Sequence, residues 1–200
     1  MFRYLITNGG NISSYLISLL LTLPIILLSL SVHEASHAWM ANKLGDPTAR
    51  NLGRLTLNPF KHLDLVGFIC MLLFGFGWAN PVPVNSRYFK KPRRDMALTA
   101  AAGPLSNIVL GFIFVSLYEI SYLLTVRLFP SVAASAPMVI YVWLTFLQMG
   151  AELNVYLAVF NLIPVPPLDG SRLFYIFLPV KWYFGIMKYE KYISIALFAL

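Results

Sequence analysis

The feature that most constrains the fold is an apolar run from Ser14 to Val32, which leads directly into the five residues His33–His37. A helix needs about 20 apolar residues to cross the hydrocarbon core of a bilayer. The run meets that need, and its helical pattern continues to a terminator at Gly45–Pro47. Only Arg3 precedes the run as a basic residue, and no small-x-small cleavage site follows it. We therefore expect a retained membrane helix rather than a cleaved signal peptide.

Further apolar segments repeat this pattern along the chain. Met96–Val126 and Met138–Leu162 are each long enough to span a bilayer, and Leu63–Ala79 and Leu173–Met187 are shorter apolar segments. The whole sequence is 58% hydrophobic and only 12% charged, whereas soluble domains carry roughly 25% charged residues. This composition indicates a membrane protein rather than a water-soluble one.

The segments between the spans indicate irregular pieces at one membrane face. Arg54–Asn58 alternates apolar and polar residues like a short strand, and the prolines of Pro81–Asn85 favour an extended backbone. Glycines interrupt Leu63–Ala79, which suggests a re-entrant or interfacial segment. We expect an all-α polytopic membrane protein, a bundle of about four to six membrane segments with short strand-like or re-entrant pieces near one face. We expect residues 1–200 to form a single domain, shortened at an end that falls inside the apolar run Ile193–Leu200.

The net charge of +7 follows from basic residues gathered in the loops. The positive-inside rule explains such loops by cytoplasmic retention, so we expect no nucleic-acid partner. It also places the loop face in the cytoplasm, and we expect an integral protein of the plasma membrane with its active site nearer that face. The basic loop residues are Lys43, Arg50, Arg54, Lys61, Arg87, Lys90, Lys91, Arg93 and Arg94.

The residues that follow the first apolar run fit the pattern H-E-x-x-H. Positions four apart lie on one face of a helix, so His33 and His37 can direct their rings at one metal ion. Glu34 is adjacent and can act as the general base for a metal-activated water. Solvated polar residues on a helix would be the simpler interpretation, but ionisable groups beside a membrane span are costly and favour a functional site.

A catalytic metal needs a third protein ligand. The single cysteine, Cys70, cannot supply a thiolate cluster, so the ligand must be a histidine or a carboxylate. Asp169 follows a proline-broken stretch at membrane depth, where irregular backbone is tolerated only inside protein or along a cavity. This favours Asp169, although a turn residue is the plain alternative. Glu119, Glu152 and His62 remain as other candidates.

Four stretches together resemble the site-2 protease family of intramembrane zinc metalloproteases. They are His33–His37, Pro81–Asn85, Ala102–Asn107 and Asn161–Gly170. The first and the last discriminate most, because the family pairs an H-E-x-x-H helix with a later Asp-Gly segment.

The resemblance implies a zinc-dependent intramembrane endopeptidase with one Zn²⁺ per chain, held by His33, His37 and Asp169. It implies that Glu34 is the catalytic base and that Asn161 holds or polarises the substrate. Asn107 is expected to act in packing or hydrogen bonding. The implied substrate is a membrane-spanning protein or a leftover signal peptide. We expect a short form, without the PDZ or CBS domain of larger members.

Two alternatives stay open. An inactive relative would keep the metal site without proteolysis, but the intact Glu34 argues against it. A metal or ion transporter would show two related halves or several ligand sets, whereas the sequence offers one set.

Overall fold

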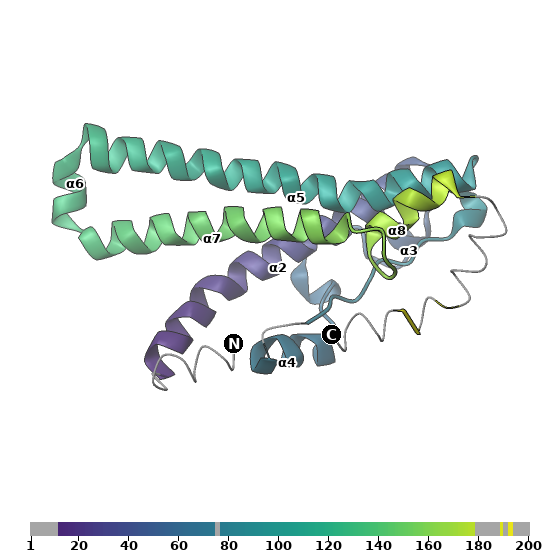
Figure 1. Cartoon of the computed structure of the whole chain (residues 1–200), viewed down its shortest axis with the longest axis horizontal. Helices are drawn as coiled ribbons and strands as arrows, with labels where there is room; N and C mark the ends of the chain where they lie inside the picture. Colours follow the sequence, from purple (N-terminus) through teal and green to yellow (C-terminus); the bar gives the residue numbers. More distant parts are fainter. Residues whose placement is uncertain (1–11, 75–76, 179–188, 190–191, 194–200) are drawn as a thin grey trace. The chain divides into compact units, whose positions relative to one another are not determined.

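The computed structural model describes residues 12–74, 77–178, 189 and 192–193, and Figure 1 shows the order of the helices along the chain. Helix dominates the described residues, and no strand is assigned among them. The all-helical fold class is therefore confirmed. Most of the expected apolar segment Leu173–Met187, and nearly all of Ile193–Leu200, lie outside the described residues.

Helix α2, Ile12–Lys43, contains the first apolar run and continues through the H-E-x-x-H residues, as expected. It ends where Gly45 adopts a positive φ of 108°, which glycine tolerates without a steric penalty. The amide of Asp46 then donates to the carbonyl of Ala41 at 2.9 Å, which satisfies an end carbonyl of the helix. The described part from Ile17 to Lys43 is long and apolar enough to cross a membrane.

Two more helices have the length and composition of membrane spans. Helix α5 covers Pro92–Tyr122 and continues as the π-helical turn η3, Leu123–Leu128. Helix α7 covers Pro137–Asn161. A short helix, α6, Pro130–Ser135, connects them, and it begins with a proline, which is accepted in the first turn of a helix. In the described part of the chain, three helices are thus able to span a bilayer.

The chain between α2 and α5 is folded mainly from short pieces. They are α3 (Thr48–Asn51), η1 (Pro59–Lys61), α4 (Leu65–Phe74) and η2 (Ser86–Tyr88). The expectation of a strand-like piece at Arg54–Asn58 is wrong, because these residues are irregular and bent and form no ladder. Alternation alone does not make a strand when no neighbouring strand is there to accept its hydrogen bonds. Pro81–Asn85 is free of helix, as its prolines require.

The two ends of the apolar segment Leu63–Ala79 lie side by side. Leu63 and Ala79 form an isolated antiparallel bridge, and the amide of Asn80 donates to the carbonyl of His62 at 2.8 Å. Between them α4 has 10 residues, or roughly 15 Å, about half of what a bilayer crossing requires. The two ends of this segment lie together, as the expected re-entrant form requires.

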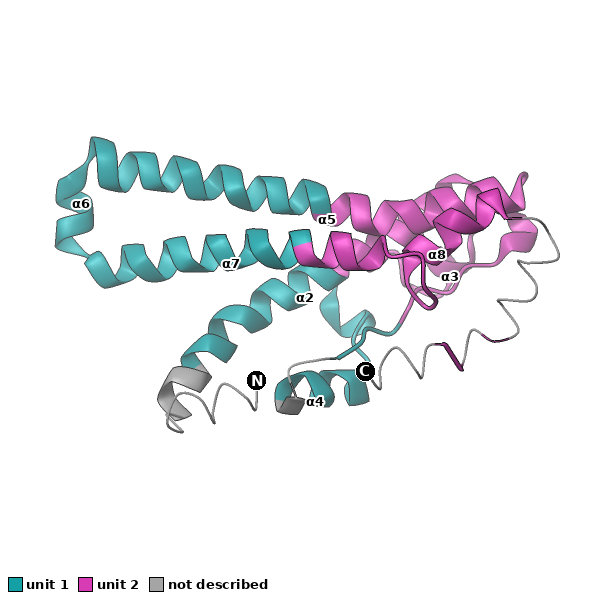
Figure 2. Ribbon diagram, in the orientation of Figure 1, with its two compact units in different colours: residues 1–30, 58–80, 108–155 teal, residues 31–57, 81–107, 156–200 magenta. Residues whose placement is uncertain are grey.

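The chain forms two compact units, coloured separately in Figure 2. Unit 1 comprises residues 1–30, 58–80 and 108–155. Its core joins α5 to α7 through Phe114, Leu147 and Ala151. Gly150 allows this packing, because a Cβ there would lie 2.5 Å from the Phe114 ring. Asn154 adds a buried hydrogen bond to Ser29 of α2 at 2.9 Å.

Unit 2 comprises residues 31–57, 81–107 and 156–200. It contains the last turns of α2, the first turns of α5, the end of α7, and helix α8, Asp169–Phe174, which leads into η4, Tyr175–Phe177. Three candidate spans thus bring one end each to the same unit. The H-E-x-x-H residues and Asp169 can meet there only because the chain between α2 and α5 starts and finishes at that end.

Candidate metal centre

The two histidines of α2 point the same ring atom at a common position. His33 and His37 are four residues apart, and their Nε2 atoms lie 3.0 Å from each other. Both residues are buried, with 6% and 8% of their surface exposed. The helical spacing alone brings the rings to one face, and neighbouring elements then fix their orientation.

Each imidazole ring has its Nδ1 atom beside an oxygen that can only accept a hydrogen bond, which fixes the proton of the ring on Nδ1. The Nδ1–H of His33 donates to Oδ1 of Asn107 at 2.5 Å, and the Nδ1–H of His37 donates to the carbonyl of Thr99 at 2.8 Å. Both partners lie on α5. With Nδ1 protonated in each neutral ring, the lone pair of each Nε2 faces the other ring. Such outer partners orient histidines for a metal and raise their basicity.

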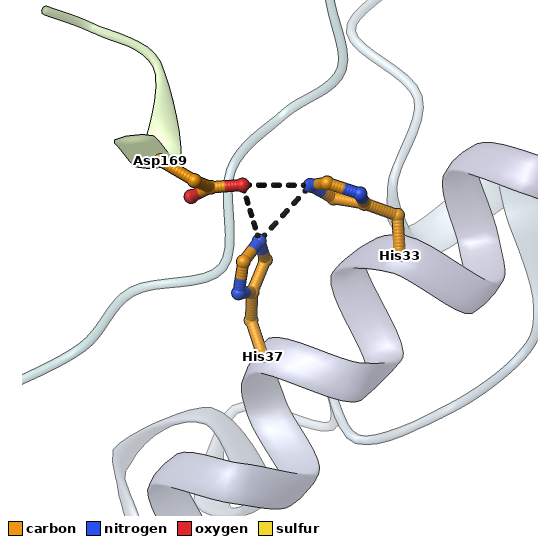
Figure 3. Close-up of side chains that lie close together, drawn as sticks. All are labelled: His33, His37 and Asp169. Carbon is orange, nitrogen blue, oxygen red and sulfur yellow. Dashed lines mark hydrogen bonds and ion pairs between the residues drawn. The ribbon is translucent and has the colours of Figure 1, made fainter. Parts of the chain in front are cut away.

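Asp169 closes a triangle with the two rings, as Figure 3 shows. Its Oδ2 lies 3.1 Å from Nε2 of His33 and 3.2 Å from Nε2 of His37. Ligand bonds of about 2.0–2.1 Å at tetrahedral angles place ligand atoms roughly 3.3–3.4 Å apart. The three edges of 3.0–3.2 Å come close to that requirement.

Three electron-rich atoms at such distances repel one another unless a cation lies among them. Burial by itself would raise the pKa of the Asp169 carboxyl. When a proton on a ring Nε2 takes the place of a metal, the hydrogen bonds and charges of the protonated rings outweigh that effect and hold the pKa of Asp169 well below its usual range. Asp169 therefore stays ionised, and the donor set of two imidazoles and a carboxylate fits a divalent metal ion. Among the described residues, these three form the one such group.

Two glycines leave the space that this geometry needs. A Cβ on Gly103 of α5 would lie 2.4 Å from Nε2 of His37 and 2.6 Å from Cε1 of His33. A Cβ on Gly170 would lie 2.2 Å from the carbonyl oxygen of Leu162. Gly103 thus lets α5 approach the imidazoles, and Gly170 lets α8 start against the loop that follows α7.

Glu34 lies beside the triangle and is held by the backbone. Its Oε2 accepts a hydrogen bond from the amide of Val82 at 2.9 Å, and the residue is 8% exposed. The stretch Pro81–Asn85, to which Val82 belongs, is fixed at its other end, where the amide of Asn85 donates to Oδ2 of Asp46 at 2.7 Å. Asp46 is fully buried. Two carboxylates from α2 and the turn after it therefore hold Pro81–Asn85 beside the histidines.

A cavity of about 450 Å³ joins these groups. His33, His37, Asp169 and Glu34 all contribute to its wall. The remaining lining residues are Pro81, Val82, Pro83, Val84, Met96, Thr99, Ala100, Asn161, Pro167 and Arg172. The cavity is large enough for a short stretch of peptide, and a carboxylate beside the donor triangle is well placed to handle a proton there.

The other expected site residues lie in different surroundings. Asn161, the last residue of α7, lines the cavity, and its Nδ2 donates to the carbonyl of Leu157 in its own helix at 2.9 Å. Glu152 is exposed and accepts from Gln148 at 2.9 Å, Glu119 is exposed on α5, and His62 is buried in unit 1. Among the described residues, the group that could hold a metal ion includes none of these last three.

Sequence reasoning missed several residues around the site. It gave Gly103, Thr99, Asp46 and Arg172 no role near the metal. It did assign hydrogen bonding to Asn107. The missed contacts of Asp46 and Thr99 join residues 39 and 62 positions apart in the chain, and spacing along one element carries no signal of such pairs.

The fold and the site define a helical integral membrane protein with a buried His–His–Asp set arranged for a metal ion. Comparison with known families specifies it further. The model of peptidase family M50 matches residues 21–199. The chain belongs to this family, the site-2 protease family.

Three curated relatives agree with that assignment. "Putative zinc metalloprotease YwhC" of Bacillus subtilis is 43% identical over 148 residues, covering 74% of this chain and 64% of the relative. "Putative zinc metalloprotease Rip2" of Mycolicibacterium smegmatis is 31% identical, covering 72% of this chain and 52% of the relative. "Putative zinc metalloprotease MJ0611" of Methanocaldococcus jannaschii is 29% identical, covering 59% and 50%. No solved structure matches the chain.

These coverages mean that the chain spans about half to two thirds of the length of the curated relatives it matches.

Proposed function

We propose that this chain is a zinc-dependent intramembrane endopeptidase, with one Zn²⁺ held by His33, His37 and Asp169. The observation that carries the proposal is the buried triangle of three lone-pair donors 3.0–3.2 Å apart, with a carboxylate beside it in the same cavity. The membership of peptidase family M50, and the relatives named for zinc metalloproteases, support the choice of metal and reaction.

Zinc bound at this position would supply Lewis acidity, which activates water and polarises a peptide carbonyl. Glu34 is the proposed general base. Its Oε2 is held by the amide of Val82, which leaves Oε1 to take a proton from the attacking water. The same oxygen then delivers that proton to the leaving amine. Asn161 is the proposed additional donor, because it lines the cavity and its amide can turn from its own helix toward a substrate carbonyl.

The proposed substrate is a membrane-spanning protein or a leftover signal peptide in a locally extended form. Pro81–Asn85 supports this, because it is free of helix, lines the cavity through Pro81–Val84 and is fixed at Val82 and Asn85. Such a stretch can pair with an extended peptide along its edge. Replacing the residues of this stretch should weaken cleavage, and unchanged cleavage would exclude the role.

The proposed location is the plasma membrane, with the site nearer the cytoplasmic face and residues 1–200 acting as a single domain. The distribution of charge supports the orientation. The basic residues of the loops lie almost all in unit 2, whereas the connection between α5 and α7 carries only Arg127. Lys and Arg of short loops are retained in the cytoplasm.

The test is hydrolysis of a labelled membrane-spanning peptide by the protein reconstituted in liposomes with zinc. Cleavage should require zinc and stop on its chelation, and Glu34→Gln should bind zinc normally but lose activity by about 100-fold or more. Arg127→Gln, at the other end of the spans, should cleave normally. An equal rate for wild type and Glu34→Gln would exclude Glu34 as the base, and zinc-independent cleavage would exclude the metalloprotease.

A further inference from the structure

The cavity beside the donor triangle contains one guanidinium. Arg172 lies on α8, three residues after Asp169, and lines the same cavity as Glu34 and the two histidines. Residues three apart on a helix are neighbours, with Cβ atoms about 5–6 Å apart. Arg172 is the one Lys or Arg residue among those that line this cavity.

This guanidinium has no carboxylate partner among the described residues. Its Nη1 donates to Sδ of Met96 at 3.5 Å, and a thioether is a weak acceptor. The two carboxylates of the cavity wall are already engaged, Glu34 with the amide of Val82 and Asp169 with the imidazoles. In the described part of the chain, the recorded ion pairs involve only His33, His37 and Asp169.

A half-buried guanidinium in such surroundings favours an incoming anion. Its five N–H groups form a rigid fork that matches the two oxygens of a carboxylate. At a half-buried position the fork loses part of its hydration, and a weakly accepting thioether offsets little of that loss. A lysine would present a point charge without the fork, so the residue type adds geometric selectivity for a planar, bidentate group.

We propose that Arg172 forms a subsite that binds a carboxylate of the peptide in the cavity. This inference rests on the proposed function only in taking the occupant to be a peptide. The bound carboxylate could have either of two sources in a peptide. One is an acidic side chain of the substrate near the scissile bond. The other is the carboxylate formed when water cleaves the bond, since hydrolysis of an amide yields one carboxylate and one ammonium group at neutral pH.

The test is calorimetric binding of three short apolar peptides to the detergent-purified protein, both zinc-loaded and stripped by a chelator. The first peptide has blocked ends and no charge, the second carries one internal Glu, and the third has a free C-terminal carboxylate. The stripped protein is decisive, because a carboxylate can also bind to zinc itself.

The wild type should bind at least one carboxylate peptide roughly 10- to 100-fold more tightly than the neutral peptide, as expected for charge-assisted hydrogen bonds. The preferred peptide identifies the source, as acidic side chain or cleaved product. Arg172→Gln should abolish the preference, and Arg172→Lys should retain part of it. Arg50→Gln, an exposed change on α3, should bind like wild type.

Equal binding of all three peptides by wild type would overturn the subsite, and so would a preference that survives in stripped Arg172→Gln. Normal zinc content in Arg172→Gln shows that α8 still presents Asp169, so a lost preference is not a folding defect. A different result would contradict the proposed function. If the zinc-loaded wild type cleaves no peptide but keeps the Arg172-dependent preference, the subsite is supported and the protease function is excluded.

Discussion

Gly103 shows how one residue without a side chain shapes the site. A methyl group there would lie 2.4–2.6 Å from atoms of both imidazoles, and the rings are held by Asn107 and Thr99 on the same helix. We expect Gly103→Ala to displace the rings and weaken zinc binding by about 10- to 100-fold, the effect of overpacking by 1–3 kcal/mol. Zinc affinity from competition with a chelating dye measures this.

Gly111→Ala is the matched control for Gly103→Ala. It makes the same change on the same helix, but its nearest contact is an ordinary 3.4 Å to Cβ of Asn154. Its zinc affinity should equal that of wild type. An equal loss in both variants would assign the effect to helix α5 as a whole rather than to the imidazoles.

Asn107 gives a second prediction at this scale. It accepts the Nδ1 proton of His33 and is fully buried. Asn107→Ala removes the acceptor that fixes the ring, so zinc affinity should fall by about 10- to 100-fold. Asn107→Asp, which keeps an acceptor at the same place, should lose less. Wild-type affinity in Asn107→Ala would show that packing alone orients His33.

At the scale of elements, Asp46 links the end of α2 to the stretch Pro81–Asn85. Its Oδ2 accepts from the amide of Asn85, and its Oδ1 accepts from the amide and hydroxyl of Thr48. Asp46→Asn leaves one buried partner unsatisfied, which costs about 1–3 kcal/mol. We expect zinc content to stay normal while KM for a peptide rises, because the cavity wall is released and the metal ligands are not touched.

Thr48→Val is the control for Asp46→Asn. It removes the hydroxyl that bonds to Asp46 but leaves the bond to Asn85 in place. Its KM should stay near wild type. A change in kcat alone in Asp46→Asn, with KM unchanged, would contradict the role of Asp46 in holding the wall of the cavity.

The elements also show what the sequence could and could not predict. The spans of α2, α5 and α7 were predictable because long apolar runs have few alternatives in a bilayer. Two of the proposed ligands, His33 and His37, lie four residues apart on one helix, so their proximity could also be predicted from the sequence. Arg54–Asn58 was mispredicted because alternation cannot reveal that the described part of the chain offers it no partner strand. The contacts of Asp46 and Gly103 depend on tertiary approach between distant segments, which no local pattern records.

For the whole molecule, the ends of Leu63–Ala79 meet, so the loops before and after it should lie on one membrane face. Because Cys70 is the single cysteine, single cysteines can be placed in a Cys70→Ala background. Arg50→Cys and Arg87→Cys should react with an impermeant maleimide only in inside-out vesicles. Ser131→Cys, in α6, should react only from the opposite side. Labelling of positions 50 and 87 from opposite faces would exclude the re-entrant segment.

The central claim is that His33, His37 and Asp169 together hold one zinc ion. The most direct test is the zinc content of the detergent-purified protein, wild type beside Asp169→Ala, with Glu152→Ala as a control carboxylate outside the triangle. The account predicts about one zinc per chain in wild type and in Glu152→Ala, and a clear loss in Asp169→Ala, because a site with two of its three ligands binds weakly. Full zinc retention in Asp169→Ala, or a wild type that binds no zinc after reconstitution, would contradict it.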